Sequence, residues 1–337
     1  MINVRSSFSW ALQARPFKLP LLGGAYCTLF WAEAGKHYSP NATPLLALHS
    51  VNAAASAIEM MPLLTEQSSH RPVFAIDLPG FGASSKRDVA YTPQNMRDAV
   101  LAATQWIAGN VSAQPLDVAA LSLSAEFATQ AVLKRPQLFR SLALISPTGM
   151  ELRRAQERYQ EGRSRENKTL RSVLRRSLIG SGLYRTLTTR AGVSWFLART
   201  WGRPDFDPRL LETALRSARQ PGAEHAALDF VAGALFTRGI VERYRALPLP
   251  VWVSHGTRGS FTDFGACPKF TGSRLQLNPL QRTAFAGGAM PHFEQPQAFA
   301  AAYDQFLASR FGAVPGRGHA LDSGRGGTGF GAQRAAA

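Results

Sequence analysis

The chain has 337 residues, of which 45% are hydrophobic and 18% are charged, and this balance excludes a largely disordered protein. Its two cysteines, Cys27 and Cys267, are too few for a disulfide framework or a metal-binding pattern, and we expect a reducing, cytoplasmic location. The formal net charge is +16, and residues 151–220 hold 16 Lys and Arg against 7 Asp and Glu, which favours anionic ligands. No zinc-finger spacing, RNP-like pattern or basic heptad accompanies this charge, so we expect no nucleic-acid partner.

The N-terminal part of the chain is apolar but does not have the pattern of a membrane segment. The apolar run at residues 19–32 is interrupted by Gly23 and Gly24 and is shorter than a membrane-spanning helix. It also lacks the order of basic, apolar and small residues found in signal peptides. We therefore expect no stable membrane insertion.

Short apolar runs alternate with amphipathic segments through the first half of the chain. Two runs on either side of Gly23 and Gly24 predict a β-hairpin, at residues 17–22 and 25–32. Four further runs have the composition of buried parallel strands: residues 44–49, 72–76, 116–121 and 141–145. Helical periodicity is found between them, at residues 53–64, 92–107 and 125–133. This order predicts an α/β fold with a mostly parallel central sheet wrapped by helices.

The alternation stops near the middle of the chain and resumes before its end. Between these points the sequence has helical periods with Gly and Pro breaks and no clear strand. After them we expect strands at residues 251–254 and 282–286 and a helix at 296–311. The C-terminal stretch is rich in Gly, Ala and Arg and is predicted to be disordered. The predicted layout is an N-terminal arm, a core in two parts, a helical cap inserted after the sixth strand, and a disordered tail: residues 1–15, 16–147 with 248–311, 148–247, and 312–337.

The strongest chemical signal is the segment LDVAALSLSAEFA at residues 116–128, where a predicted strand runs directly into a helix. A nucleophile elbow needs small residues two before and two after its serine, because the turn is too tight for larger side chains. Ala120 and Ser124 meet this demand around Ser122, which we therefore predict to be the nucleophile. Ser124 is a weaker candidate, since Glu126 would then occupy a position that needs a small side chain. An ordinary strand-to-helix turn with capping serines is the alternative.

Several landmarks in the same order resemble the α/β-hydrolase superfamily over about residues 15–311. They are the turn His49-Ser50, the loop DLPGFGAS at residues 77–84, the elbow around Ser122, the strand end His255-Gly256, and PHFEQP at residues 291–296. The SLSAEF and GAMPHFE segments also resemble a bacterial branch of that superfamily.

The resemblance has consequences for the site. It implies a serine hydrolase that needs no metal or organic cofactor. The backbone N–H groups of Leu123 and Val51 would then form the oxyanion hole, with Asn52 as an additional side-chain donor. Glu126, one helical turn after Ser122, would either face this site or favour the positive end of its helix.

The departures from the family pattern concern the catalytic base. The family usually has a histidine directly after the glycine that here is Gly288, but this chain has Ala289. A serine hydroxyl needs a neighbour that takes its proton, and His292 is the histidine nearest to this segment. We predict His292 as the base, with a structural role at the helix start as the alternative. His255 and His225 are weaker candidates.

The acid of the usual triad is also displaced. The family places an aspartate about three residues after the strand that here ends at His255-Gly256, and this chain has no carboxylate until Asp263. We predict that Asp263 orients the base, with Glu151 as a second choice. Ser260 stands where the bacterial branch carries an aspartate, which counts against full activity.

Together these features predict a hydrolase of a small ester-like molecule, either a carboxylic ester, a lactone or a thioester. Aromatic residues and arginines in the cap, Arg171 and Arg175 among them, favour an aromatic or anionic substrate, although such arginines also commonly form a solvated face. A catalytically weakened protein that binds a ligand or a partner protein is the first alternative. A lyase or C–C hydrolase on the same fold is the second.

Overall fold

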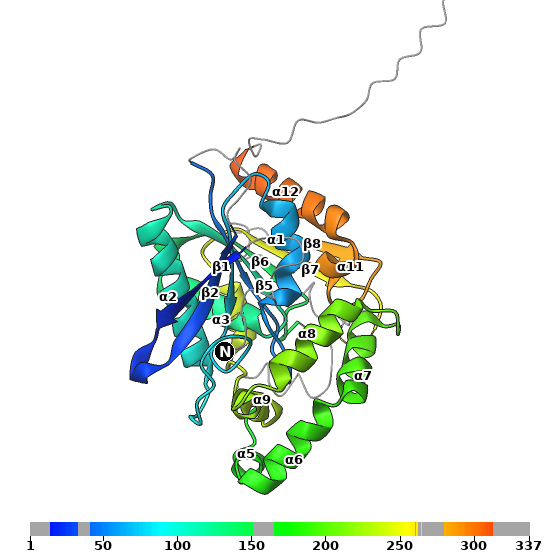
Figure 1. Cartoon of the computed structure of the whole chain (residues 1–337). Helices are drawn as coiled ribbons and strands as arrows, with labels where there is room; N and C mark the ends of the chain where they lie inside the picture. The colour runs from blue at the N-terminus through cyan, green and yellow to red at the C-terminus, as the bar shows by residue number, and fades with distance from the viewer. Residues whose placement is uncertain are drawn as a thin grey trace, which may run out of the picture.

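An eight-stranded sheet lies at the centre of the computed structural model, which describes residues 14–32, 41–150, 165–259, 261, 264 and 280–312 (Figure 1). The strand order is β1-β2-β4-β3-β5-β6-β7-β8. β2 pairs antiparallel with β1 and with β4, and all other neighbours are parallel. The strands are β1 (Ala14–Pro20), β2 (Tyr26–Ala32), β3 (Leu45–Leu48), β4 (Val73–Asp77), β5 (Leu116–Leu121), β6 (Phe139–Ile145), β7 (Val251–Gly256) and β8 (Leu280–Phe285). The α/β class with a mostly parallel sheet, predicted from the alternating pattern, is confirmed.

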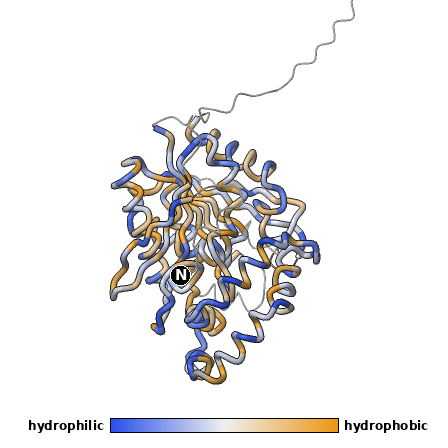
Figure 2. Tube along the Cα trace, viewed as in Figure 1, coloured by the Kyte–Doolittle hydropathy of each residue, from blue (hydrophilic) through white to orange (hydrophobic). Residues whose placement is uncertain are grey.

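Helices cover both faces of this sheet. α2 (Pro93–Asn110) and α3 (Ser124–Lys134) pack on one face, and their apolar residues belong to one core cluster. α1 (Met61–Gln67) and α12 (Pro296–Phe311) pack on the other face in a second cluster, next to the short α11 (Pro291–Glu294). The central strands β3, β4 and β5 are buried throughout and mainly hydrophobic, and the centre of the molecule in Figure 2 is coloured accordingly, because neither face of these strands meets water.

The helix expected at residues 53–64 begins later in the structure. The segment starts with a 3-10 helix, η3 (Ala57–Met60), and α1 follows it. The N–H of Ala54 donates to the side chain of Asn52, and the N–H of Ala57 donates to Asp77. Because these two N–H groups bond to side chains and not to helical carbonyl groups, residues 53–56 form a loop before η3. Two other short 3-10 helices are η2 (Leu22–Gly24) and η4 (Pro136–Leu138).

A group of helices lies between β6 and β7 in the sequence and projects to one side of the sheet (Figure 1). They are α5 (Lys168–Leu174), α6 (Ser177–Leu187), α7 (Arg190–Trp201), α8 (Pro208–Ala218), α9 (Ala223–Val231) and α10 (Ile240–Arg245). We call this helical segment the cap. Among the described residues, none of the helices combines the length and hydropathy needed to cross a bilayer.

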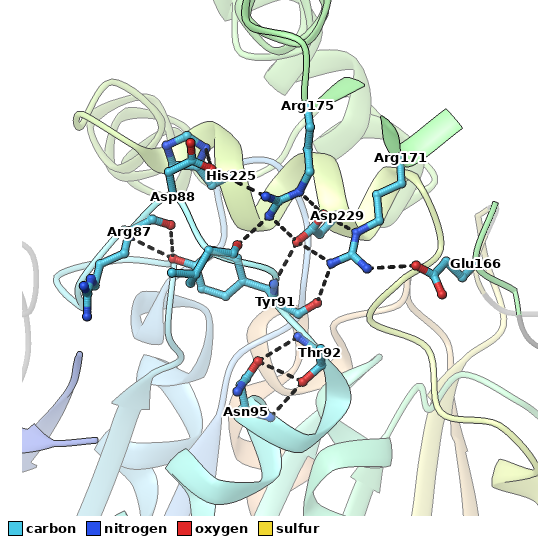
Figure 3. A network of polar contacts seen from close by, with 11 residues as sticks. Arg87, Asp88, Tyr91, Thr92, Asn95, Glu166, Arg171, Arg175, His225 and Asp229 are labelled. Atoms are coloured by element: carbon cyan, nitrogen blue, oxygen red, sulfur yellow. Dashed lines mark hydrogen bonds and ion pairs between the residues drawn. The ribbon is translucent and has the colours of Figure 1, made fainter. Parts of the chain in front are cut away.

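A buried carboxylate joins the cap to the core (Figure 3). Asp229 on α9 is completely buried and accepts hydrogen bonds from Arg171, at 2.9 Å from Nε, and from Arg175, at 3.0 Å from Nη2. It also accepts the backbone N–H of Tyr91, from the loop before α2, at 2.8 Å. Burial raises the pKa of Asp229, but the bonds from both arginines outweigh it and hold the pKa below its usual value. Arg171 and Arg175 therefore link the cap to the loop before α2 through Asp229.

We expect Asp229→Asn to destabilise the protein by about 2–4 kcal/mol, because the two guanidinium groups would lose their only shared carboxylate in a buried setting. Urea unfolding followed by tryptophan fluorescence measures this loss. Asp98→Asn is the matched control, since the Asp98 pairs with Arg97 and Lys134 are exposed and should contribute less than about 1 kcal/mol. Equal stability of both variants would contradict a structural role for Asp229.

Candidate functional site

Ser122 occupies a strained turn between β5 and α3. Its φ angle is +56°, in the left-handed region that side chains other than glycine rarely adopt. Among the described residues, Ser146 at the end of the neighbouring β6 is the one other non-glycine residue with a positive φ, at +44°. The N–H of Ser122 donates to the carbonyl of Ile145 at 2.8 Å, which ties the two strand ends together. Strain of this kind typically costs about 1–3 kcal/mol and is concentrated at functional sites.

The residues around Ser122 have different and identifiable partners. Ser124, the weaker candidate nucleophile, is fully buried, and its hydroxyl donates to the carbonyl of His49. Glu126 is also fully buried and accepts the N–H of Thr237 at 2.6 Å and the hydroxyl of Thr148 at 2.5 Å. Glu126 therefore links α3 to the loop after β6 and to the segment between α9 and α10.

The Ser122 turn opens into a cavity of about 430 Å³ between the core and the cap. Its floor is polar and its walls are mainly apolar and aromatic. The core side consists of Ser50, Val51, Asn52, Glu59, Leu121, Ser122, Leu123, Ser146, Thr148, Ala289 and Met290. The other side consists of Arg165, Trp195, Phe196, Leu197, Thr200, Phe230, Phe236 and Phe261. A mostly apolar pocket with a few polar groups is the usual form of a small-molecule site.

Two backbone N–H groups in this cavity have the properties of oxyanion donors. Leu123 lies at the N-terminus of α3, where helical N–H groups have no partner within the helix. Val51 follows β3 and lines the same cavity. Within the described part of the chain, the backbone N–H groups of Leu123 and Val51 donate to no other group. The side chain of Asn52 is different: its Nδ2 donates to Ser50 Oγ and to Glu59 Oε1, so both of its N–H bonds are used inside the protein.

His292, the predicted base, is bonded to the backbone of Glu59 in this structure. Its side chain is fully buried, and Nε2 lies 2.8 Å from the backbone carbonyl of Glu59, so Nε2 carries the proton and donates it. Nδ1 has no hydrogen-bond partner among the described residues. Burial lowers the pKa of His292 to about 4, which makes it a weak proton acceptor at neutral pH. Among the described contacts none joins His292 to Ser122, so the base role stays a prediction that this geometry does not support.

The remaining candidate acids and bases lie elsewhere or outside the described residues. Asp263 and Glu151 both lie outside the described residues. His255 accepts from Arg282 Nε at 2.8 Å and contacts the carbonyl of Gly256 through Nδ1. His225 is on α9, 3.5 Å from Asp88 (Figure 3). In the described part of the chain, no three His, Cys, Asp or Glu side chains are grouped so that they could hold a metal ion.

The landmark residues before the elbow have structural roles. Nε2 of His49 accepts the N–H of Leu78 at 3.0 Å, and burial lowers the pKa of His49 to about 4. Asp77 accepts the N–H groups of Ala57 and Ala83 at 2.7 and 2.6 Å, and its burial raises its pKa to about 6. A Cβ atom at Gly82 would lie 2.0 Å from the Asp77 carboxyl, which explains the glycine in this loop.

Glu59 lines the site but was not predicted from the sequence. It is 6% exposed, lines the cavity, and accepts the N–H of Ser50 at 2.8 Å and Nδ2 of Asn52 at 3.0 Å. Burial raises its pKa above the usual value, against the opposing effect of these hydrogen bonds. One signal was available: Glu59 is the single charged residue in the otherwise apolar run at residues 57–64.

A family model described as "Alpha/beta hydrolase family" matches residues 45–302. Solved structures with similar folds include carboxylesterase CesB from Bacillus subtilis, with 16% sequence identity and a TM-score of 0.65, covering 91% of this chain and 96% of that one. Another is 2-hydroxy-6-oxo-6-phenylhexa-2,4-dienoate hydrolase (BphD) from Rhodococcus sp. strain RHA1, with 14% identity and a TM-score of 0.65, covering 88% and 99%. No curated protein sequence matches significantly. At these identities the structural likeness shows the fold, and the family match over most of the chain shows that this protein belongs to the alpha/beta hydrolase family.

Proposed function

We propose that this protein hydrolyses a small ester-like substrate, a carboxylic ester, lactone or thioester, with Ser122 as the nucleophile. The observation that carries the proposal is the strained conformation of Ser122 in a cavity that Leu123 and Val51, with their backbone N–H groups, also line. Such a strained conformation calls for a compensating role, and strain of this kind clusters at active sites. Acyl transfer provides such a role, because the hydroxyl of the nucleophile has to project from the sharp turn at the end of its strand.

The proposed chemistry has two stages. The Ser122 hydroxyl attacks the carbonyl carbon, and the N–H groups of Leu123 and Val51 bind the developing oxyanion. Collapse of the tetrahedral intermediate breaks the bond to the alcohol or thiol, which takes up the proton from the Ser122 hydroxyl and, in a lactone, stays joined to the acyl chain. Water then hydrolyses the acyl ester on Ser122 and restores the hydroxyl. A triad of Ser122 with His292 and Asp263 requires the hydrogen bond between His292 and the Glu59 carbonyl to break, because Nε2 is committed to it.

The walls of the cavity support an aromatic or apolar acyl group as the substrate. Phe230 and Phe236 stack with ring centroids 5.7 Å apart, and Phe196 contacts Phe261 at 5.9 Å. The guanidinium of Arg165 lies over the Phe236 ring, 4.0 Å from its centroid, and brings positive charge to the same wall. An acyl group that also carries a negative charge fits this combination.

A second candidate is a protein that binds such a molecule without rapid turnover. Two observations favour it: Ala289 lines the cavity where the family usually has its catalytic histidine, and His292 is bound to Glu59. This candidate predicts that an aromatic carboxylate raises the melting temperature while p-nitrophenyl esters are not cleaved. Rapid ester cleavage that depends on Ser122 would exclude it.

We expect Ser122→Ala to abolish cleavage of p-nitrophenyl esters and covalent labelling by a fluorophosphonate, because both need the hydroxyl. Mass spectrometry of the labelled wild-type protein should identify the peptide that contains Ser122. Ser56→Ala is the control, since the Ser56 hydroxyl is buried, has no described hydrogen-bond partner and does not line this cavity. Turnover or labelling that persists in Ser122→Ala would refute the proposed function.

Phe196→Ala should lower kcat/KM for an aromatic acyl ester about 10-fold and leave that for an acetyl ester within about 2-fold. The reason is that Phe196 offers apolar surface to a large acyl group, which a small one does not reach. Steady-state kinetics with p-nitrophenyl benzoate and p-nitrophenyl acetate measure the difference on one variant, so the acetyl ester serves as the internal control. An equal effect on both esters would place the acyl group elsewhere.

A further inference from the structure

We propose that Glu59 is a positioning residue that holds the oxyanion turn, residues 49–52, and that His292 holds Glu59. The inference rests on the proposed function, since it concerns the N–H group of Val51 as an oxyanion donor. It gives roles to two buried residues that the chemistry at Ser122 does not otherwise use.

The Glu59 carboxyl binds the residues on both sides of Val51. Its Oε2 accepts the backbone N–H of Ser50 at 2.8 Å, and its Oε1 accepts Nδ2 of Asn52 at 3.0 Å. Asn52 continues the connection, because its Nδ2 also donates to Ser50 Oγ and its Oδ1 accepts the N–H of Ala54. With both neighbours fixed, the peptide plane of Val51 has little freedom to rotate. Its N–H therefore stays directed without a described acceptor of its own.

The segment that carries Glu59 is itself fixed at both ends. At the start of η3, the N–H of Ala57 donates to Asp77 at 2.7 Å. At the other end, Nε2 of His292 donates to the Glu59 carbonyl at 2.8 Å, from a position 233 residues further along the chain. A neutral imidazole is suited to this role, since it supplies a donor in a fully buried place without adding a charge.

The arrangement differs from that of a purely structural buried acid. Glu59 lines the cavity together with Ser50, Asn52 and Ser122, so the carboxyl and the oxyanion turn lie at the reaction site. Oxyanion donors act mainly in the transition state, and their displacement by a fraction of an ångström is enough to weaken them. Loss of the Glu59 bonds should therefore appear in kcat and much less in KM.

The first experiment exchanges the carboxyl group of Glu59 and the amide group of Asn52. In Glu59→Gln one oxygen remains to accept from Ser50, but the new NH2 group faces the NH2 group of Asn52. We expect kcat to fall about 10–100-fold, with KM within about 3-fold. Adding Asn52→Asp restores an acceptor opposite that NH2 group and keeps one negative charge in the pair, so the double variant should recover most of kcat. Failure of the double variant to recover, while it remains folded by circular dichroism, would overturn the proposal.

The second experiment separates the two roles of His292. Glutamine can place an amide N–H close to the position of the histidine Nε2, but it cannot act as a base at neutral pH. With the positioning role, His292→Gln keeps kcat within about 5-fold of the wild type, and His292→Leu lowers it as Glu59→Gln does. If His292 is the base, His292→Gln loses activity to the level of Ser122→Ala, and the role assigned here is wrong.

Backbone amide exchange gives a readout that does not depend on turnover. Mass spectrometry should show faster exchange in peptides covering residues 45–54 in Glu59→Gln, because the repulsion between its NH2 group and that of Asn52 weakens the bonds that hold the turn. Ser56→Ala, next to η3 but without a hydroxyl partner in the described structure, should leave exchange unchanged. A wild-type protein without esterase activity would refute the proposed function alone. Unchanged exchange in Glu59→Gln would refute the positioning role of Glu59 whatever the activity.

Discussion

The tight turn from β5 into α3 is the constraint on which the site depends. It forces Ser122 into the left-handed region, and the surrounding structure compensates for this strain through the bond from Ser122 N–H to Ile145 and the bond from Ser124 to His49. The second bond is informative, because it joins the start of α3 to the end of β3. The turn at Ser122 and the turn at residues 49–52 are therefore connected to each other rather than two independent loops.

Buried carboxylates hold the loops at this end of the sheet. Asp77 binds the N–H groups of Ala57 and Ala83, Glu59 binds that of Ser50, and Asp229 binds that of Tyr91. Loops at the carboxyl ends of parallel strands have many backbone donors that no strand or helix satisfies. A carboxylate can accept several of them at once, at the cost of its own desolvation. The shape of the cavity thus rests on acids that take no part in the proposed chemistry.

The cap and the core meet in two chemically different ways. Around the cavity the contact is apolar and aromatic, which leaves room for a ligand and is tolerant of small shifts. At the Asp229 network it is ionic and directional, and Arg171 of α5 and Arg175 directly after it fix one side of the cap on the loop before α2 (Figure 3).

Some features of this protein follow from the sequence by itself, because they depend on neighbouring residues. The period of the apolar runs predicts the parallel sheet, and the small residues Ala120 and Ser124 predict the elbow around Ser122. Each of these features depends on residues that are close together in the chain, and the sequence shows such residues directly.

Other features were decided only by the tertiary structure, because they depend on partners far apart in the chain. The sequence leaves open whether Arg171 and Arg175 face substrate or solvent, and the structure shows that both bind the buried Asp229. The spacing after Gly288 suggests His292 as a base, but the orientation of its ring depends on the Glu59 carbonyl. Glu59 itself carries no motif, since its role comes from bonds to a turn that the chain forms before η3. Folding decides which distant residues come into contact, whereas the sequence shows only which residues are present.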